Sequence, residues 1–161
     1  MILSERGVLG AVRQVVNWNQ FREYFGSYTP GANGAYALQG FFDNGGAMAY
    51  VTRLKSTAVG KPTAASVELV DGFKVKAGYK GQEDPGEWGN QLSVEITVNS
   101  GEEDRFDLTV YLKGVKVETK SRLPKEQGKA ATILNNDSTG SKYIMVETDG
   151  IKTSPRPRKN S

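Results

Sequence analysis

The side chains that most often carry out catalysis are missing from this sequence. Its 161 residues include no His and no Cys. The chain therefore has no imidazole to act as a general base near neutral pH, and it cannot build a Ser-His-Asp or Cys-His site by itself. It also lacks thiolate ligands for metals and any disulfide framework. Chemistry by this chain would have to rely on Asp and Glu.

Three segments that contain acidic residues are candidates for such chemistry. The run Glu102–Asp104 could bind a hard cation, but it falls between two predicted strands, where a solvated loop is the ordinary occupant. The run Asp43–Gly46 is explained more simply by a helix end and turn. Asp84 and Glu87 flank Pro-Gly, and catalysis there would need both carboxyls to converge in a cleft. We assign no catalytic, cofactor-binding or metal-binding residue.

Two further motifs resemble ligand sites only in part. Gly60-Lys61 is followed by Pro62 and lacks the preceding glycine of a phosphate-binding loop. Trp88 lies in a Gly-rich loop before a predicted strand, where a large aromatic either contacts a ligand or plugs the end of a core. We favour the plug. An exposed Trp88 would instead favour a carbohydrate-binding surface.

Charge and hydropathy argue against nucleic-acid and membrane partners. The net charge is +3, and part of it comes from the C-terminal basic residues, Lys152, Arg156, Arg158 and Lys159. A solvated surface of mixed charge with a basic tail explains this better than a nucleic-acid-binding face. No signal-peptide pattern follows Met1, and no apolar run approaches the roughly 20 residues of a membrane span.

Residues 1–55 alternate strand and helix patterns. A strand-like run with Val12, Val15 and Val16 precedes Asn17, which with Gln20 matches a capping box. The helix that follows ends at Gly26, and one of its faces carries apolar side chains that should be buried, namely Trp18, Phe21 and Phe25.

A second helix and a second strand complete this part. The helix is predicted from about Ala35 to Asp43, with a buried side formed by Leu38, Phe41 and Phe42. The nearly continuous apolar run Ala47–Leu54 predicts a strand covered on both faces, as in a parallel or mixed sheet. The first part is therefore a strand–helix–helix–strand unit, small for a complete α/β domain.

From residue 63 the apolar residues recur with a period of two. Each alternating segment has one polar and one apolar face, which is typical of antiparallel sheets packed on one core. The segments are Phe73–Ala77, Leu92–Val98, Phe106–Leu112, Val115–Val117 and Ile144–Val146. Lys113-Gly114 is placed to make a hairpin turn. Residues 63–149 thus predict a β-sandwich or barrel, residues 150–161 a flexible basic tail, and the whole chain an α+β fold.

Two blocks of sequence, in this order, resemble the sheath proteins of contractile phage tails and of related injection systems. The first block comprises Asn17–Phe21, Phe25-Gly26, Phe41–Gly46 and Ala49–Leu54. The second comprises Asp84–Val94, Phe106–Tyr111 and Ser141–Val146. The resemblance covers about residues 5–149.

The resemblance implies how these parts are used. In that family the first block belongs to a larger α/β domain, and the second opens a β-sandwich inserted into it. Members usually carry an N-terminal arm and a long C-terminal part that completes the α/β domain and provides a second arm. Arms link neighbouring subunits by adding strands to their sheets. Residues 1–55 would then be a partial sheath domain, and the chain alone is expected to be monomeric.

The implied function is mechanical rather than enzymatic. Sheath subunits assemble helically around a tail tube and contract to drive it through a cell envelope, using energy stored in subunit interfaces and no cofactor. The expected partners are other sheath subunits, the tail tube protein and the baseplate. The expected location is the virion tail sheath, assembled in the host bacterial cytoplasm. The alternatives are a virion-decorating or carbohydrate-binding β-sandwich module and a small hydrolase that uses only Asp and Glu.

Overall fold

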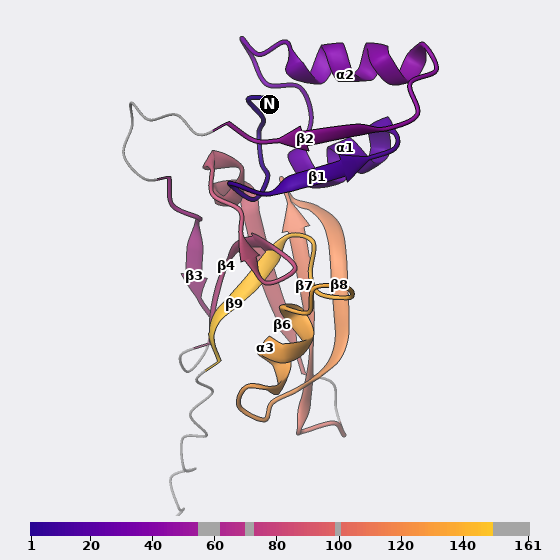
Figure 1. Ribbon diagram of the computed structural model, residues 1–161. Coiled ribbons are helices and arrows are strands. Elements are labelled where there is room, and N and C mark those ends of the chain that lie inside the picture. Colours follow the sequence, from indigo (N-terminus) through magenta and orange to yellow (C-terminus); the bar gives the residue numbers. More distant parts are fainter. Residues whose placement is uncertain (55–61, 70–72, 99–100, 150–161) are drawn as a thin grey trace, which may run out of the picture.

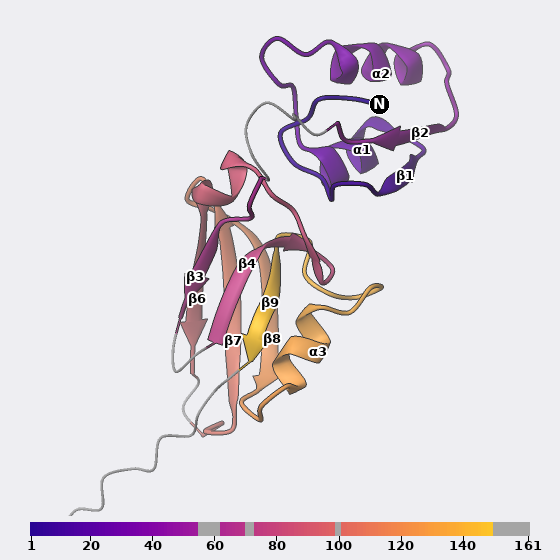
Figure 2. The same cartoon turned by 60° about the vertical axis from the view of Figure 1, so that its left-hand side comes forward.

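The computed structural model describes residues 1–54, 62–69, 73–98 and 101–149. They form an α+β fold, as predicted, in which a small helical unit lies at one end of an elongated β-sandwich (Figures 1 and 2). The predicted tail, residues 150–161, and most of the link between the two predicted domains lie outside the described residues.

The N-terminal unit contains β1 (Val12–Val15), α1 (Trp18–Phe25), α2 (Gly34–Asp43) and β2 (Ala49–Thr52). The two strands pair antiparallel, and Ile2 adds a parallel bridge to Arg53 on β2's other edge. Its core gathers side chains from both helices and both strands, namely Val15, Phe21, Phe25, Ala35 and Val51. The unit therefore has its own small apolar core.

The start of α1 follows from its sequence. The Asn17 Oδ1 accepts a hydrogen bond from the Gln20 N–H at 2.8 Å, and the Gln20 Oε1 accepts one from the Val16 N–H at 2.9 Å. This reciprocal pair is a variant of the capping box. The Gln20 side chain binds the N–H of Val16, one residue before the cap, in place of the N–H of the cap residue itself. Phe21 and Phe25 are buried and Gly26 ends the helix, so these predictions are confirmed.

Two predictions about this unit are wrong. Phe41 was expected on the buried side of α2 but is 43% exposed, whereas Leu38 and Phe42 are half-buried. The strand β2 was expected to be covered on both faces. Only the face that carries Val51 meets the helices, and Tyr50 on the opposite face is 65% exposed. The reason is that both helices pack on the same side of a two-stranded antiparallel ribbon.

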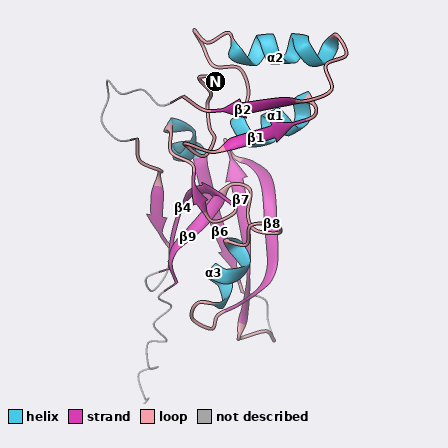
Figure 3. Ribbon diagram, in the orientation of Figure 1, coloured by secondary structure: helices cyan, strands magenta, loops and turns pink. Residues whose placement is uncertain are grey.

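The sandwich consists of two antiparallel sheets. One sheet contains β3 (Ser66–Glu68), β4 (Phe73–Tyr79), β5 (Gln82–Glu83) and β9 (Ile144–Asp149), and the other contains β6 (Leu92–Thr97), β7 (Arg105–Leu112) and β8 (Val115–Pro124). Figure 3 shows the short helix α3 (Lys129–Leu134) beside these strands. The core between the sheets includes Phe73, Val75, Phe106, Leu108, Val110, Leu123, Ala130, Leu134, Ile144 and Val146.

The predicted hairpin between β7 and β8 is confirmed. Leu112 pairs with Val115, and the two residues between them, Lys113 and Gly114, have φ angles of 53° and 76°. Positive φ at both positions is the geometry of a type I′ turn, which matches the twist of the paired strands. Four short elements were not predicted: β3, β5, α3 and the 3₁₀ turn Glu87–Gln91.

We expect Asn17→Ala to destabilise the protein by about 1 kcal/mol, because it removes the side-chain acceptor at the start of α1. The matched control is Asn19→Ala, an exposed residue inside the same helix, where alanine is the better helix former. Urea unfolding of the two variants measures the difference. Equal stabilities would contradict the role given to the cap.

Hydrogen exchange should be slower in residues 63–149 than in residues 1–54. The sandwich has two full sheets around its core, whereas the N-terminal unit has a two-stranded ribbon with one open face. Native-state exchange, resolved by peptide, measures this. Uniform protection across both parts would refute the expectation.

Candidate functional site at the junction of the two units

The most unusual residue in the structure is Asp84, whose carboxylate is fully buried between the two units. It lies in the sandwich, just after β5. A buried charge is costly unless it is paired and hydrogen-bonded. The surroundings of Asp84 therefore show what this part of the sandwich is built to hold.

The N-terminal unit supplies the partners of Asp84. The Arg6 Nε donates to Oδ2 at 3.0 Å, and the Gly7 N–H donates to Oδ1 at 2.6 Å. The Arg53 Nη1 lies 3.6 Å from Oδ1. We call Arg6, Gly7, Arg53, Asp84 and Trp88 the junction cluster.

The remaining donors of the two guanidinium groups are directed at backbone carbonyls. The Arg6 Nη2 donates to the Lys142 carbonyl at 2.6 Å. The Arg53 Nη1 donates to the Gly7 carbonyl at 3.0 Å and to the Pro85 carbonyl at 2.5 Å. Two cations therefore share one carboxylate, and carbonyl oxygens from both units stabilise the excess positive charge.

Trp88 forms the floor of the cluster. It is 3% exposed, its Nε1 donates to the Asp84 carbonyl at 3.2 Å, and the Arg6 guanidinium lies 4.2 Å from the ring centroid. Trp88 is buried, as the plug hypothesis predicted, but it belongs to neither of the two apolar core clusters. Its burial also removes the aromatic platform that a carbohydrate-binding surface would need.

Burial has the largest effect on the electrostatics of Asp84. Burial raises its pKa, against the opposing effects of Arg6, the Gly7 N–H and Arg53. Burial also lowers the pKa of Arg53, an effect that Asp84 opposes. The Glu87 side chain, by contrast, is exposed. The two carboxylates considered as a catalytic pair thus lie in different environments, and Asp84 is committed to its cationic partners.

A second set of polar contacts surrounds the cluster. Glu23 on α1 accepts hydrogen bonds from the Lys142 Nζ at 2.8 Å and from the Tyr79 hydroxyl at 2.9 Å. Burial alone would raise the pKa of Glu23, but these two bonds outweigh it and leave the pKa below its ordinary value. Tyr24 contacts Tyr79 edge to face, with centroids 5.3 Å apart.

The other acidic groups singled out in the sequence are explained by local structure. Glu102 pairs with Arg122 at 2.9 Å in the connection before β7. Asn44 closes the end of α2 by donating to the Gly40 carbonyl from its backbone and its side chain. Among the described residues, no group of three acidic side chains lies close enough to hold a metal ion. Gly60-Lys61 lies outside the described residues.

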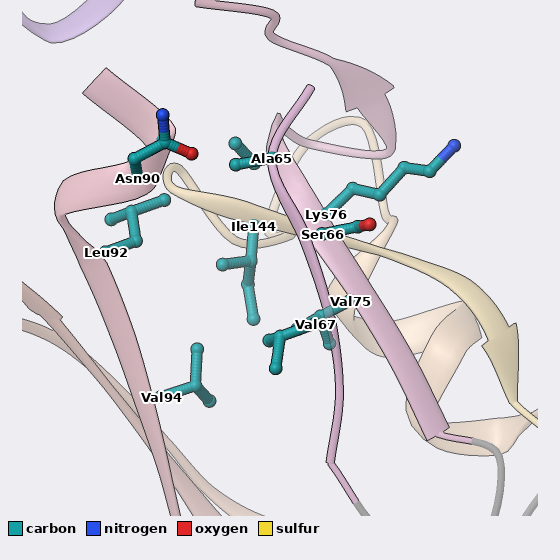
Figure 4. Close-up of a pocket in the computed structure, with 11 residues that line it drawn as sticks. Ala65, Ser66, Val67, Val75, Lys76, Asn90, Leu92, Val94 and Ile144 are labelled. Carbon is teal, nitrogen blue, oxygen red and sulfur yellow. The ribbon is translucent and has the colours of Figure 1, made fainter. Parts of the chain in front are cut away.

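Two openings in the surface are lined in large part by apolar residues. One, of about 210 Å³, lies between β3 and β6, where the two sheets diverge (Figure 4). Its apolar walls include Val67, Val75, Leu92, Val94 and Ile144, and the charged end of Lys76 points away from them. The other, of about 480 Å³, lies between α2 and β2 and is lined partly by Met1, Phe41, Met48 and Tyr50. In the part of the chain that is described, no helix is both long and apolar enough to cross a bilayer.

Comparisons with known proteins identify the fold. No protein-family model matches the sequence, and no curated protein sequence matches it. Solved structures do match, among them two sheath tail proteins. A sheath tail protein from Listeria innocua superposes with a TM-score of 0.59 at 16% identity, over 91% of this chain and 28% of that one. A sheath tail protein from Desulfitobacterium hafniense gives a TM-score of 0.57 at 17% identity, over 96% of this chain and 32% of that one.

This chain has the fold found in sheath tail proteins. The resemblance first drawn from two blocks of sequence is therefore confirmed by structure. The chain spans about a third or less of the length of each sheath tail protein it matches.

Sequence reasoning missed the two arginines of the junction cluster. Arg53 lies within the Ala49–Leu54 block, but neither it nor Arg6 was singled out. No local pattern links them to Asp84, since Arg6 and Asp84 are 78 positions apart. The sequence did offer one local signal for this site. Asp84 is an acidic residue that is followed by Pro-Gly and by Trp88, shortly before a predicted strand.

Glu23→Gln should destabilise the protein more at pH 7 than at pH 3. A carboxyl whose pKa is lowered on folding contributes stability above its unfolded pKa, about 4.3 for Glu, and that stability is lost as the pH falls through the folded pKa. For this partly exposed group the effect at pH 7 should be a few tenths of a kcal/mol to about 1 kcal/mol. Urea unfolding at both pH values measures it, with the exposed Glu87→Gln as control. An equal effect at both pH values would contradict the bridge.

Proposed function

We propose that this chain is part of a contractile tail-sheath subunit, a structural element that assembles helically around a tail tube. The supporting observation is that 91% and 96% of the chain superpose on two sheath tail proteins. The order of the two sequence blocks is independent support. In this proposal the assembly shortens on triggering and drives the tube through a cell envelope.

The proposed role is mechanical and not catalytic. The most deeply buried acid, Asp84, is held by Arg6 and by the Gly7 N–H, so it serves to join two parts of the chain. Glu23 is likewise engaged by Lys142 and Tyr79 across the same junction. In this proposal, these contacts hold the two units in one relative position, so that a force applied to one unit is passed to the other.

The proposed partners are other sheath subunits, the tail tube protein and the baseplate, and the proposed location is the virion tail, assembled in the bacterial cytoplasm. We propose that the open face of β1 and β2 contacts these partners, because Val12 and Tyr50 on this face are 64% and 65% exposed. Met1, Phe41 and Met48, which line the opening between α2 and β2 together with Tyr50, are also exposed. Apolar surface of this kind marks contact sites.

The alternative of a carbohydrate-binding or virion-decorating module is not favoured. Its strongest requirement was an exposed aromatic platform that includes Trp88, and that side chain is buried.

Light scattering with negative-stain microscopy, over a series of concentrations, tests the proposal. We expect a monomer at low concentration and, where larger species form, open arrays, rings or tubes that depend on the face of β1 and β2. Tyr50→Glu should suppress such species, whereas Val115→Glu, which alters an equally exposed residue at 65% on the β7–β8 hairpin, should not. A closed oligomer of fixed size that is insensitive to Tyr50→Glu would contradict the proposal.

A further inference from the structure

The two units of this chain do not share an apolar core. The cluster around Phe21 and Val51 and the cluster around Leu108 and Val110 are separate, with no buried residue in common. Among the described residues, the contacts between the units include hydrogen bonds and ion pairs, the ring contact of Tyr24 with Tyr79, and guanidinium packing of Arg6 on Trp88 and Tyr143 and of Arg13 on Tyr79. Something other than hydrophobic burial must therefore fix their relative orientation.

The junction cluster meets that need because its bonds are directional. Asp84 receives its two short hydrogen bonds from adjacent residues, Arg6 and Gly7, of the other unit. Arg53, from the end of β2, closes the cluster by binding carbonyls of both units, those of Gly7 and Pro85. A buried ion pair often contributes little net stability, and in some proteins buried polar groups instead specify one arrangement. The cluster is thus better suited to choosing one orientation than to holding the fold together.

We propose that Asp84 is a latch that sets the orientation of the two units, and that loss of its carboxylate frees them to move while each stays folded. Without that charge the Arg6 and Arg53 guanidiniums face each other without a counter-ion, and separation of the units would return both to water. Each unit keeps its own core, because Asp84 belongs to neither apolar cluster. This inference does not depend on the proposed function.

A distance measurement between the units tests the latch. The sequence contains no Cys, so Ala37→Cys on α2 and Thr119→Cys on β8, both exposed, would carry two spin labels at defined sites. Pulsed electron spin resonance of the full chain should give one narrow distance distribution. Asp84→Asn in the same labelled chain should at least double the width of this distance distribution, while the circular dichroism spectrum stays unchanged.

Two further variants make the result decisive. Arg6→Lys keeps the charge, but a single ammonium cannot serve both Asp84 and the Lys142 carbonyl in the way the planar guanidinium does, so intermediate broadening is expected. Glu102→Gln removes a surface ion pair with Arg122 and should leave the distribution narrow. If Asp84→Asn does not fold, Arg6→Lys carries the test. Narrow distributions in every folded variant would overturn the latch.

Discussion

The buried charge of Asp84 is the constraint on which the arrangement of this molecule depends. A carboxylate with no exposed surface must find its counter-ions within the protein, and here they come from the other unit. This requirement fixes the path of the chain at Arg6 and Gly7 and the position of Arg53 at the end of β2. The N-terminal unit is thus positioned on the sandwich by electrostatics and hydrogen bonds, while each unit folds around its own apolar core.

The glycines of the junction follow from the same constraint. Gly7 has a φ of 130°, and a Cβ there would lie 2.8 Å from the Phe25 ring. Gly86 has a φ of 144°, and a Cβ there would lie 3.1 Å from the Arg53 Nη2 and 3.2 Å from the Glu5 carbonyl. Both positions combine an unusual backbone angle with close packing, so only glycine suits them. The Pro85–Trp88 segment, part of the second block of the sheath resemblance, contacts both arginines, Arg53 through the Pro85 carbonyl and Arg6 through the Trp88 ring.

Local and periodic features were predictable from the sequence, because their causes lie within a few residues. Asn17 caps α1 through Gln20, and Lys113-Gly114 turns the chain between two alternating strands. Features that depend on distant partners were not predictable. Phe41 has the helical spacing of a core residue, yet its exposure is decided by what packs on α2. The helix α3 is only six residues long, so its few apolar positions carried too little periodic signal.

The candidate site shows the same division between local and distant causes. The sequence indicated that Trp88 would close the end of a core, since a large aromatic in a tight loop has few other stable positions. It did not indicate that Arg6 would cover the ring. A contact between residues as distant in the sequence as Arg6 and Asp84 produces no periodic pattern of residue types. Apolar cores tolerate many arrangements of similar side chains, whereas a charged junction tolerates few. A few charged side chains can therefore define how two folded units meet, even though most of the burial that stabilises each unit lies elsewhere.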